Sequence, residues 1–118
     1  MPSSFEDIHQ RIQQFSEERE WTQFHSSKNL VLALVSEVGE LAEIIQWKSD
    51  SELIDYLQTK TGKQRLSEEI ADIAIYIIRI CQQQNINLME IIENKLEINA
   101  QKYPISKSKG SAAKYTEL

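Results

Sequence analysis

The sequence predicts an all-α protein built as a four-helix-bundle-type domain. Its 118 residues include only 3 glycines and 2 prolines, so residues that break helices are rare. Apolar residues recur at three- and four-residue spacing in several long segments, which is the period of a helix with one buried face. A composition of 41% hydrophobic and 26% charged residues is typical of a globular chain.

The first two predicted helices follow pairs of serines. The first begins after Ser3 or Ser4, because an acidic residue lies three positions beyond each serine, as in a helix cap. The second begins after residues 26–27 and continues to about residue 47. Its segment 30–35 is apolar on every side, which predicts a buried helix rather than an amphipathic one.

The middle of the chain predicts one short helix and one long helix. Residues 51–58 form the short helix, and Thr61-Gly62 is expected to be a turn. The long helix covers about residues 63–84. Its isoleucine-rich centre also suits a strand, but its length and the lack of turn signals favour a helix.

The last predicted helix is capped by Asn87 and runs to about Tyr103, where Pro104 ends it. Residues beyond this proline include serine, glycine and lysines, with few apolar side chains that could pack. The expected organisation is therefore one all-α domain over residues 1–104 and a flexible tail over residues 105–118.

The charge balance and the scarcity of cysteine and histidine exclude several classes of protein. With 13 basic and 18 acidic residues the net charge is −5, whereas a nucleic-acid binder needs a basic surface. Cys81 is the only cysteine, which excludes an internal disulfide and a cysteine-based zinc site. The longest apolar stretch contains Asp72 and Arg79 and is too short to cross a membrane. No signal peptide is visible, so a cytoplasmic location is expected.

The informative feature is a pair of short acidic motifs on two predicted helices. Glu37-Val-Gly-Glu40 and Glu69-Ile-Ala-Asp72 each place two carboxylates at i and i+3, on one face of a helix. Both faces are otherwise apolar, where ionised carboxylates are unfavourable unless something compensates their charge. An all-carboxylate set suits Mg²⁺, or Mn²⁺ in its place, and Mg²⁺ usually shares its shell with substrate phosphates. The sequence also allows a structural ion-pair network, with counter-charges from Lys28, Lys48, Lys63 and Arg65.

Beyond these acids, the chain resembles the all-α nucleoside triphosphate pyrophosphohydrolases, or MazG-like proteins. Within them it looks closest to the branch that acts on dCTP. The resemblance is carried by residues 21–25 (Trp-Thr-Gln-Phe-His), 28–30, 32–43, 46–48, 68–72, 75–76, 98–99, 103–104 and 114–118. One departure is Ile12, where the resemblance leads us to expect histidine, and this leaves the base preference open.

The resemblance implies Mg²⁺-dependent cleavage of a nucleoside triphosphate, dCTP or a modified dCTP, to the monophosphate and pyrophosphate. It also implies a homodimer or a homotetramer made of two dimers. By residue match, the metal ligands are Glu37, Glu40, Glu69 and Asp72, and the substrate-binding residues are Trp21, His25, Trp47, Tyr76, Lys95, Asn99 and Tyr103. Glu40 is the candidate catalytic residue that accepts a proton from the attacking water, although a metal hydroxide is an alternative base.

Two other functions are weighed against this hydrolase. A non-catalytic helical module for oligomerisation or partner binding also fits a small chain with apolar helices, which need neighbours. Such a module gives no reason for four acids on apolar faces. A carboxylate-bridged redox metal protein is disfavoured because neither motif contains histidine.

Overall fold

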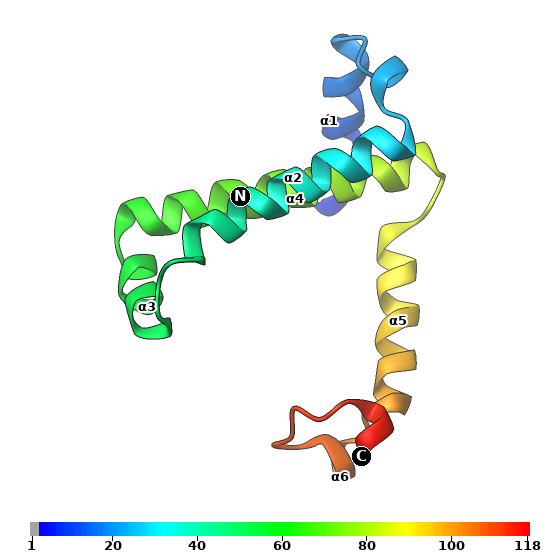
Figure 1. Cartoon of the computed structure of the whole chain (residues 1–118). Coiled ribbons are helices and arrows are strands. Elements are labelled where there is room, and N and C mark those ends of the chain that lie inside the picture. Colours follow the sequence, from blue (N-terminus) through cyan, green and yellow to red (C-terminus); the bar gives the residue numbers. More distant parts are fainter. Residues whose placement is uncertain (1–2) are drawn as a thin grey trace. The chain divides into compact units, whose positions relative to one another are not determined.

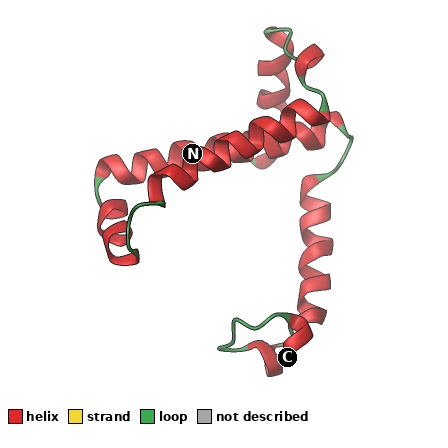
Figure 2. Cartoon of the chain, in the orientation of Figure 1, coloured by secondary structure: helices red, strands yellow, loops and turns green. Residues whose placement is uncertain are grey.

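The computed structural model describes residues 3–118. They form two compact units, and the boundary along the chain lies between Asn85 and Ile86. The first unit contains α1 (Phe5–Glu18), the 3₁₀ turn η1 (Thr22–Phe24), α2 (Ser27–Ile45), α3 (Asp50–Gln58) and α4 (Lys60–Gln83). The second contains α5 (Leu88–Lys102), α6 (Ile105–Ser108) and the 3₁₀ turn η2 (Tyr115–Glu117). Residues 3–118 contain no strand (Figure 2), which confirms the predicted all-α fold class.

In the first unit, α2 and α4 run side by side in opposite directions (Figure 1). The helices α1 and α3 also pack against α4, so α4 is the central element of this unit. The buried apolar side chains come from α1, α2 and α4, and they are Ile12, Leu30, Ile44, Ile78 and Cys81. This small core sets the register in which α2 faces α4.

Side-chain caps define where the helices begin. In each case an oxygen of the capping residue accepts a hydrogen bond from a backbone N–H three residues later, which satisfies a donor that the first turn leaves free. These caps are Ser4 for α1, Ser26 for α2, Ser49 for α3, Thr59 for α4 and Asn87 for α5. Capping by Ser4, Ser26 and Asn87 confirms the predicted starts of three helices.

The predicted turn at Thr61-Gly62 is wrong, because both residues lie in the first turn of α4. The helix begins at Lys60, three residues before its predicted start, since Thr59 accepts a hydrogen bond from the Gly62 N–H at 3.0 Å. Gly62 is buried there against the carbonyl group of Tyr56. The glycine therefore permits a close approach between α3 and α4 rather than a change of chain direction.

Gly62→Ala is expected to lower the free energy of unfolding by roughly 1–3 kcal/mol, because the new Cβ would overlap the carbonyl oxygen of Tyr56. Alanine normally favours a helix by up to about 1 kcal/mol over glycine, so a loss of stability would identify the steric effect. Gly39→Ala is the matched control, since a Cβ there meets no atom within 4 Å. Denaturant titration measures both variants, and equal stability of Gly62→Ala and the wild type would contradict the packing.

The prediction that segment 30–35 is buried on every side is wrong for the single chain. Leu30 is buried against the core, but Leu32 is 58% exposed and Val31 and Val35 are also exposed. The reason is that α2 has its main neighbour, α4, on one side only. A continuous apolar surface therefore remains on the other side of α2.

The second unit has more structure at its end than the predicted tail suggests. After α5 and Pro104, the chain forms the single-turn helix α6 and the turn η2. The ring of Tyr115 packs edge-on against Tyr103 at 6.0 Å, and the Lys102 ammonium lies 4.8 Å from the Tyr115 ring centroid. The boundary at residue 104 stays a prediction. Among all helices of residues 3–118, none combines the length and apolar character needed to span a membrane.

Candidate functional site

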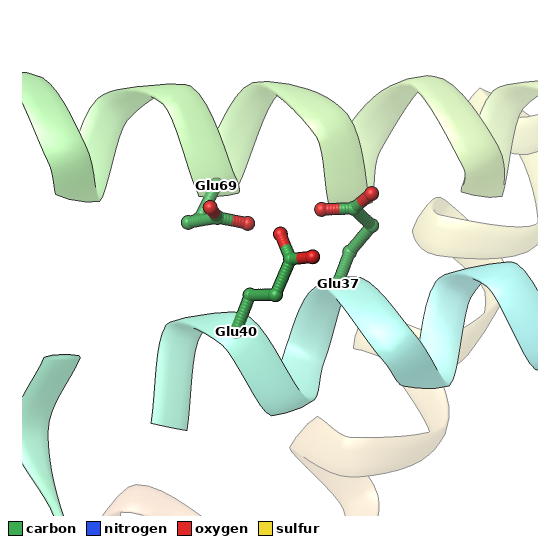
Figure 3. A group of neighbouring side chains, drawn as sticks. All are labelled: Glu37, Glu40 and Glu69. Atoms are coloured by element: carbon green, nitrogen blue, oxygen red, sulfur yellow. The ribbon is translucent and has the colours of Figure 1, made fainter. Parts of the chain in front are cut away.

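Three of the four predicted metal ligands meet between α2 and α4. Glu37 and Glu40 extend from α2 towards Glu69 on α4, and their carboxylate groups converge (Figure 3). One oxygen from each of the three side chains lies within 4.8 Å of the others. The i, i+3 spacing puts the two α2 acids on one face of the helix, and the packing of α2 on α4 supplies the third.

The fourth predicted ligand, Asp72, lies one turn further along α4 and is not part of this three-carboxylate group. It lines a neighbouring cavity together with Glu37. Its negative charge contributes to the raised pKa of both Glu37 and Glu69. The structure thus brings all four acids into one region and three of them into a geometry that can share one cation.

The electrostatics of the three-carboxylate group favour the binding of either a proton or a metal cation. Atom Oε2 of Glu37 and atom Oε2 of Glu69 are inaccessible to solvent and have no hydrogen-bond partner within residues 3–118. Burial, the adjoining carboxyls of Glu69 and Glu40, and the charge of Asp72 raise the pKa of Glu37 to about 7. The pKa of Glu69 is raised too, by burial first and then mainly by the charge of Glu40.

The structure does not support the alternative of an ion-pair network around these acids. Over residues 3–118, the one ion pair joins Arg19 to Glu18 and lies on the surface. Two of the proposed counter-charges are used elsewhere: Lys48 Nζ donates to the Ile44 carbonyl at 2.9 Å, and Arg65 donates to the Tyr56 hydroxyl at 2.9 Å. Buried carboxylate oxygens without donors are what a hard divalent cation would satisfy, so the residues present fit a metal.

The raised pKa of Glu37 predicts that metal-free protein loses stability as pH rises from about 5 to 8. Its pKa is near 4.5 when unfolded and about 7 when folded, so the folded state binds more protons in that interval. Each step up in pH therefore favours unfolding, until the group is fully ionised above pH 7. Thermal unfolding in EDTA measures this trend, and Glu37→Gln should flatten it.

Adding Mg²⁺ should raise the melting temperature more at pH 8 than at pH 5, because a cation competes with the proton for the same oxygens. Parallel pH curves for the wild type and Glu37→Gln in EDTA would contradict the assigned pKa.

A cavity of about 530 Å³ adjoins the acids in the first unit. Its lining combines the acids Glu37 and Asp72 and two arginines with rings and aliphatic side chains. The predicted substrate-binding residues Trp21, His25 and Tyr76 all line it. A cavity of this size, with aromatic rings and charged groups in its wall, suits a small ligand that has a flat ring and an anionic group.

Trp21 reaches the cavity because of the way α1 ends. Glu20 adopts a left-handed conformation with φ 56°, and the Trp21 N–H donates to the Ser16 carbonyl at 2.9 Å. This closes α1 and turns the chain so that the Trp21 ring packs edge-on against Phe15 at 5.7 Å. The same ring meets His25 edge-on at 6.4 Å.

Of the other four predicted substrate-binding residues, one lies in the first unit and does not line this cavity, and three lie in the second unit. Trp47 follows the end of α2, is 87% exposed and lies outside the cavity. Lys95, Asn99 and Tyr103 belong to the second unit, where the Tyr103 N–H donates to the Asn99 carbonyl at 2.8 Å. Their roles toward a substrate stay predictions.

The structure adds cavity residues that the sequence analysis did not assign to the site. They are Ile8, Arg11, Phe15, Ser16, Ile75 and Arg79, and the cavity also contains Ile12, the position where the resemblance leads us to expect histidine. The apolar ones lie on the stripes that indicated helices, and such stripes do not separate core from cavity wall. Arg79 was visible as a charge within an apolar run, and this was the one signal that could have drawn attention to it.

Known proteins resemble this chain in sequence. The sequence pattern of the MazG-like family matches residues 32–118. The chain is 43% identical over 115 residues to dCTP pyrophosphatase 1 of Mus musculus, an alignment that covers 98% of this chain and 68% of that protein. It is 40% identical to dCTP pyrophosphatase 1 of Homo sapiens, with the same coverage.

A solved structure resembles this chain in fold as well as in sequence. The structure of a pyrophosphatase from Archaeoglobus fulgidus matches with a TM-score of 0.80 at 35% identity, covering 88% of this chain and 95% of the other. The sequence pattern, the relatives and the fold agree over most of the chain. This chain belongs to the MazG-like family.

Proposed function

We propose that this protein is a nucleoside triphosphate pyrophosphohydrolase that cleaves dCTP or a modified dCTP to the monophosphate and pyrophosphate. The observation that carries the proposal is the three-carboxylate group of Glu37, Glu40 and Glu69, which lies beside a cavity lined by aromatic rings. The similarity of nearly the whole chain to dCTP pyrophosphatases supports the choice of base.

The proposed cofactor is Mg²⁺, with Mn²⁺ as a possible substitute. Glu37, Glu40 and Glu69 would hold it, and Asp72 completes the proposed ligand set from its position on α4. The all-oxygen donor set favours a hard cation over zinc or copper. A triphosphate carries about four negative charges, so these acids would repel it unless a cation lay between them.

In the proposed mechanism the three carboxylates would hold a cation, whose chemistry would be to neutralise charge on the phosphate oxygens as pyrophosphate leaves. Trp21 stacks against the nucleoside and, with Tyr76, holds it in the cavity. Glu40 accepts the proton of the attacking water, because it belongs to the acid cluster and is exposed to solvent. In-line displacement at a phosphorus then yields the two products.

The assembly proposed for this enzyme is a homodimer or a dimer of dimers. Apolar side chains of α2, including Val31, Leu32, Val35 and Val38, are exposed in the single chain. Helices with apolar residues on several sides need such neighbours. We propose no polymeric nucleic acid or membrane as partner, in keeping with the acidic charge balance. Light scattering on the purified chain gives the mass that checks this assembly, and a monomer would contradict it.

Pyrophosphate release from a panel of nucleoside triphosphates, with Mg²⁺ or with EDTA, tests the function. We expect release from dCTP or a 5-substituted dCTP only when Mg²⁺ is present. Faster turnover of dUTP or of a purine nucleotide would retain the enzyme class and contradict the base preference. Absence of turnover of every triphosphate would favour a non-catalytic helical module instead.

A further inference from the structure

The cavity wall contains a buried arginine that has no acidic partner among residues 3–118. Arg79 on α4 is 3% exposed, and no carboxylate of residues 3–118 lies within ion-pair distance of its guanidinium group. A buried charge of this kind is unfavourable unless hydrogen bonds compensate it. Arg79 makes three: Nε donates to His25 Nδ1 at 2.9 Å, Nη2 to Thr22 Oγ1 at 3.1 Å and Nη1 to Gln82 Oε1 at 2.8 Å.

The bond to His25 fixes the protonation of the imidazole. An arginine side chain only donates hydrogen bonds and stays charged, so Nδ1 of His25 must be the unprotonated acceptor. The neutral ring then carries its proton on Nε2. Burial and the charge of Arg79 both lower the pKa of His25, which keeps the ring neutral. The Nε2–H group has no hydrogen-bond partner within residues 3–118, although His25 lines the cavity.

The neighbouring residues of α4 bond backbone carbonyl groups of His25 and of α1. Gln83 Nε2 donates to the His25 carbonyl at 3.0 Å, and Gln82 Nε2 donates to the His9 carbonyl at 2.7 Å. Arg79 therefore acts within a set of contacts that ties η1 and α1 to the last turns of α4. Its own contribution is the pair of bonds to the side chains of His25 and Thr22.

We propose that Arg79 is a positioning residue for nucleotide binding. It holds His25 as the Nε2–H tautomer and anchors Thr22, so that His25 donates a hydrogen bond to an acceptor atom of the nucleoside. This inference rests on the proposed function, because it assumes that a nucleotide occupies the cavity. It assigns to Arg79 no contact with the substrate and no part in the chemical step.

The tautomer of His25 can be measured without any activity. In the wild-type protein, ¹⁵N NMR of the imidazole should show an unprotonated Nδ1 and a protonated Nε2, and adding dCMP should shift the Nε2 resonance. Arg79→Met removes the donor while keeping an apolar chain of similar length, and both tautomers should then be populated. A protonated Nδ1 in the wild type, or an unchanged Nε2–H tautomer in Arg79→Met, would overturn the proposal.

Kinetics with dCTP and Mg²⁺ test the effect on binding. Arg79→Met should raise KM roughly 3- to 10-fold, the range expected for one lost hydrogen bond, with kcat within about 2-fold. Arg79→Lys keeps one donor and should restore part of the loss. In a His25→Phe background, Arg79→Met should add no further increase in KM, because the two residues act through one contact. Independent, multiplying effects would overturn the proposal.

Two further variants serve as a control and as a substitute for Arg79→Met. Arg65→Gln is the matched control, since Arg65 lies on the same helix and bonds the Tyr56 hydroxyl outside the cavity. It should leave KM and the His25 tautomer unchanged.

If Arg79→Met does not fold, Thr22→Val removes one anchor of the guanidinium and should also raise KM. An unchanged KM in Thr22→Val would overturn the proposal. Failure of the wild type to hydrolyse any triphosphate overturns the proposed function, whereas the NMR result decides the Arg79–His25 contact by itself.

Discussion

Replacing Glu40 by glutamine is expected to reduce pyrophosphate release from dCTP by about 10³-fold or more while leaving the helical circular dichroism spectrum intact. The amide keeps the shape of the side chain, but it cannot accept the proton from water, and this step contributes roughly 10²- to 10⁴-fold. It also removes one of the three converging carboxylates. Initial rates at saturating Mg²⁺ measure the loss.

Glu43→Gln is the matched control for Glu40→Gln, because Glu43 is an exposed acid on the same helix outside the three-carboxylate group. Its activity should equal that of the wild type. Asp72→Asn should reduce release as strongly as Glu40→Gln if Asp72 completes the ligand set. Full activity in a well-folded Glu40→Gln protein would refute the assigned role of Glu40.

The second large effect is expected at Trp21, where alanine should raise KM for dCTP by about 10- to 100-fold with a smaller change in kcat. Stacking of a base on an aromatic ring is worth roughly 1–3 kcal/mol, and losing it weakens ground-state and transition-state binding alike. Trp21→Phe should retain part of this affinity, because the edge-on contact with Phe15 can still orient the smaller ring. Steady-state kinetics with dCTP and Mg²⁺ separate the two constants.

Trp47→Ala gives the comparison for Trp21→Ala. The sequence resemblance predicts that Trp47 binds substrate, whereas in the single chain the side chain is 87% exposed and outside the cavity. A change of KM below about 3-fold is expected if Trp47 stays exposed in the working enzyme. A loss equal to that of Trp21→Ala would show that Trp47 reaches the nucleotide. If Trp21→Ala leaves KM unchanged, the aromatic cavity does not bind the base.

Local sequence signals were sufficient for most of the secondary structure. Ser4, Ser26 and Asn87 cap helices as predicted, because a cap depends on residues within one turn of each other. The turn predicted at Thr61-Gly62 failed for a non-local reason. Gly62 is required where α4 passes the Tyr56 carbonyl, and a glycine at a close contact looks like a turn signal when only the sequence is read.

Part of the candidate site could likewise be predicted from the sequence, and part could not. Spacing alone places Glu37 and Glu40 on one helical face. The sequence also linked them to Glu69 and Asp72, through an all-carboxylate set that suits one cation and through the family resemblance. It did not indicate that Asp72 lies apart from the other three, or that Trp47 lies away from the cavity. Those positions depend on the register of α2 against α4 and on how each helix ends.

The sequence by itself determined the all-α class, the capped starts of three helices and the pairing of acids within each motif. These depend on the 3.6-residue period and on contacts within a single turn, which any short stretch of chain carries. Only the tertiary structure decided that Arg79 bonds His25, 54 positions away. It also decided that α2 and α4 pack with buried carboxylate oxygens of Glu37 and Glu69 between them. The physical reason is that helix packing selects, among many chemically similar side chains, the few that share a cavity.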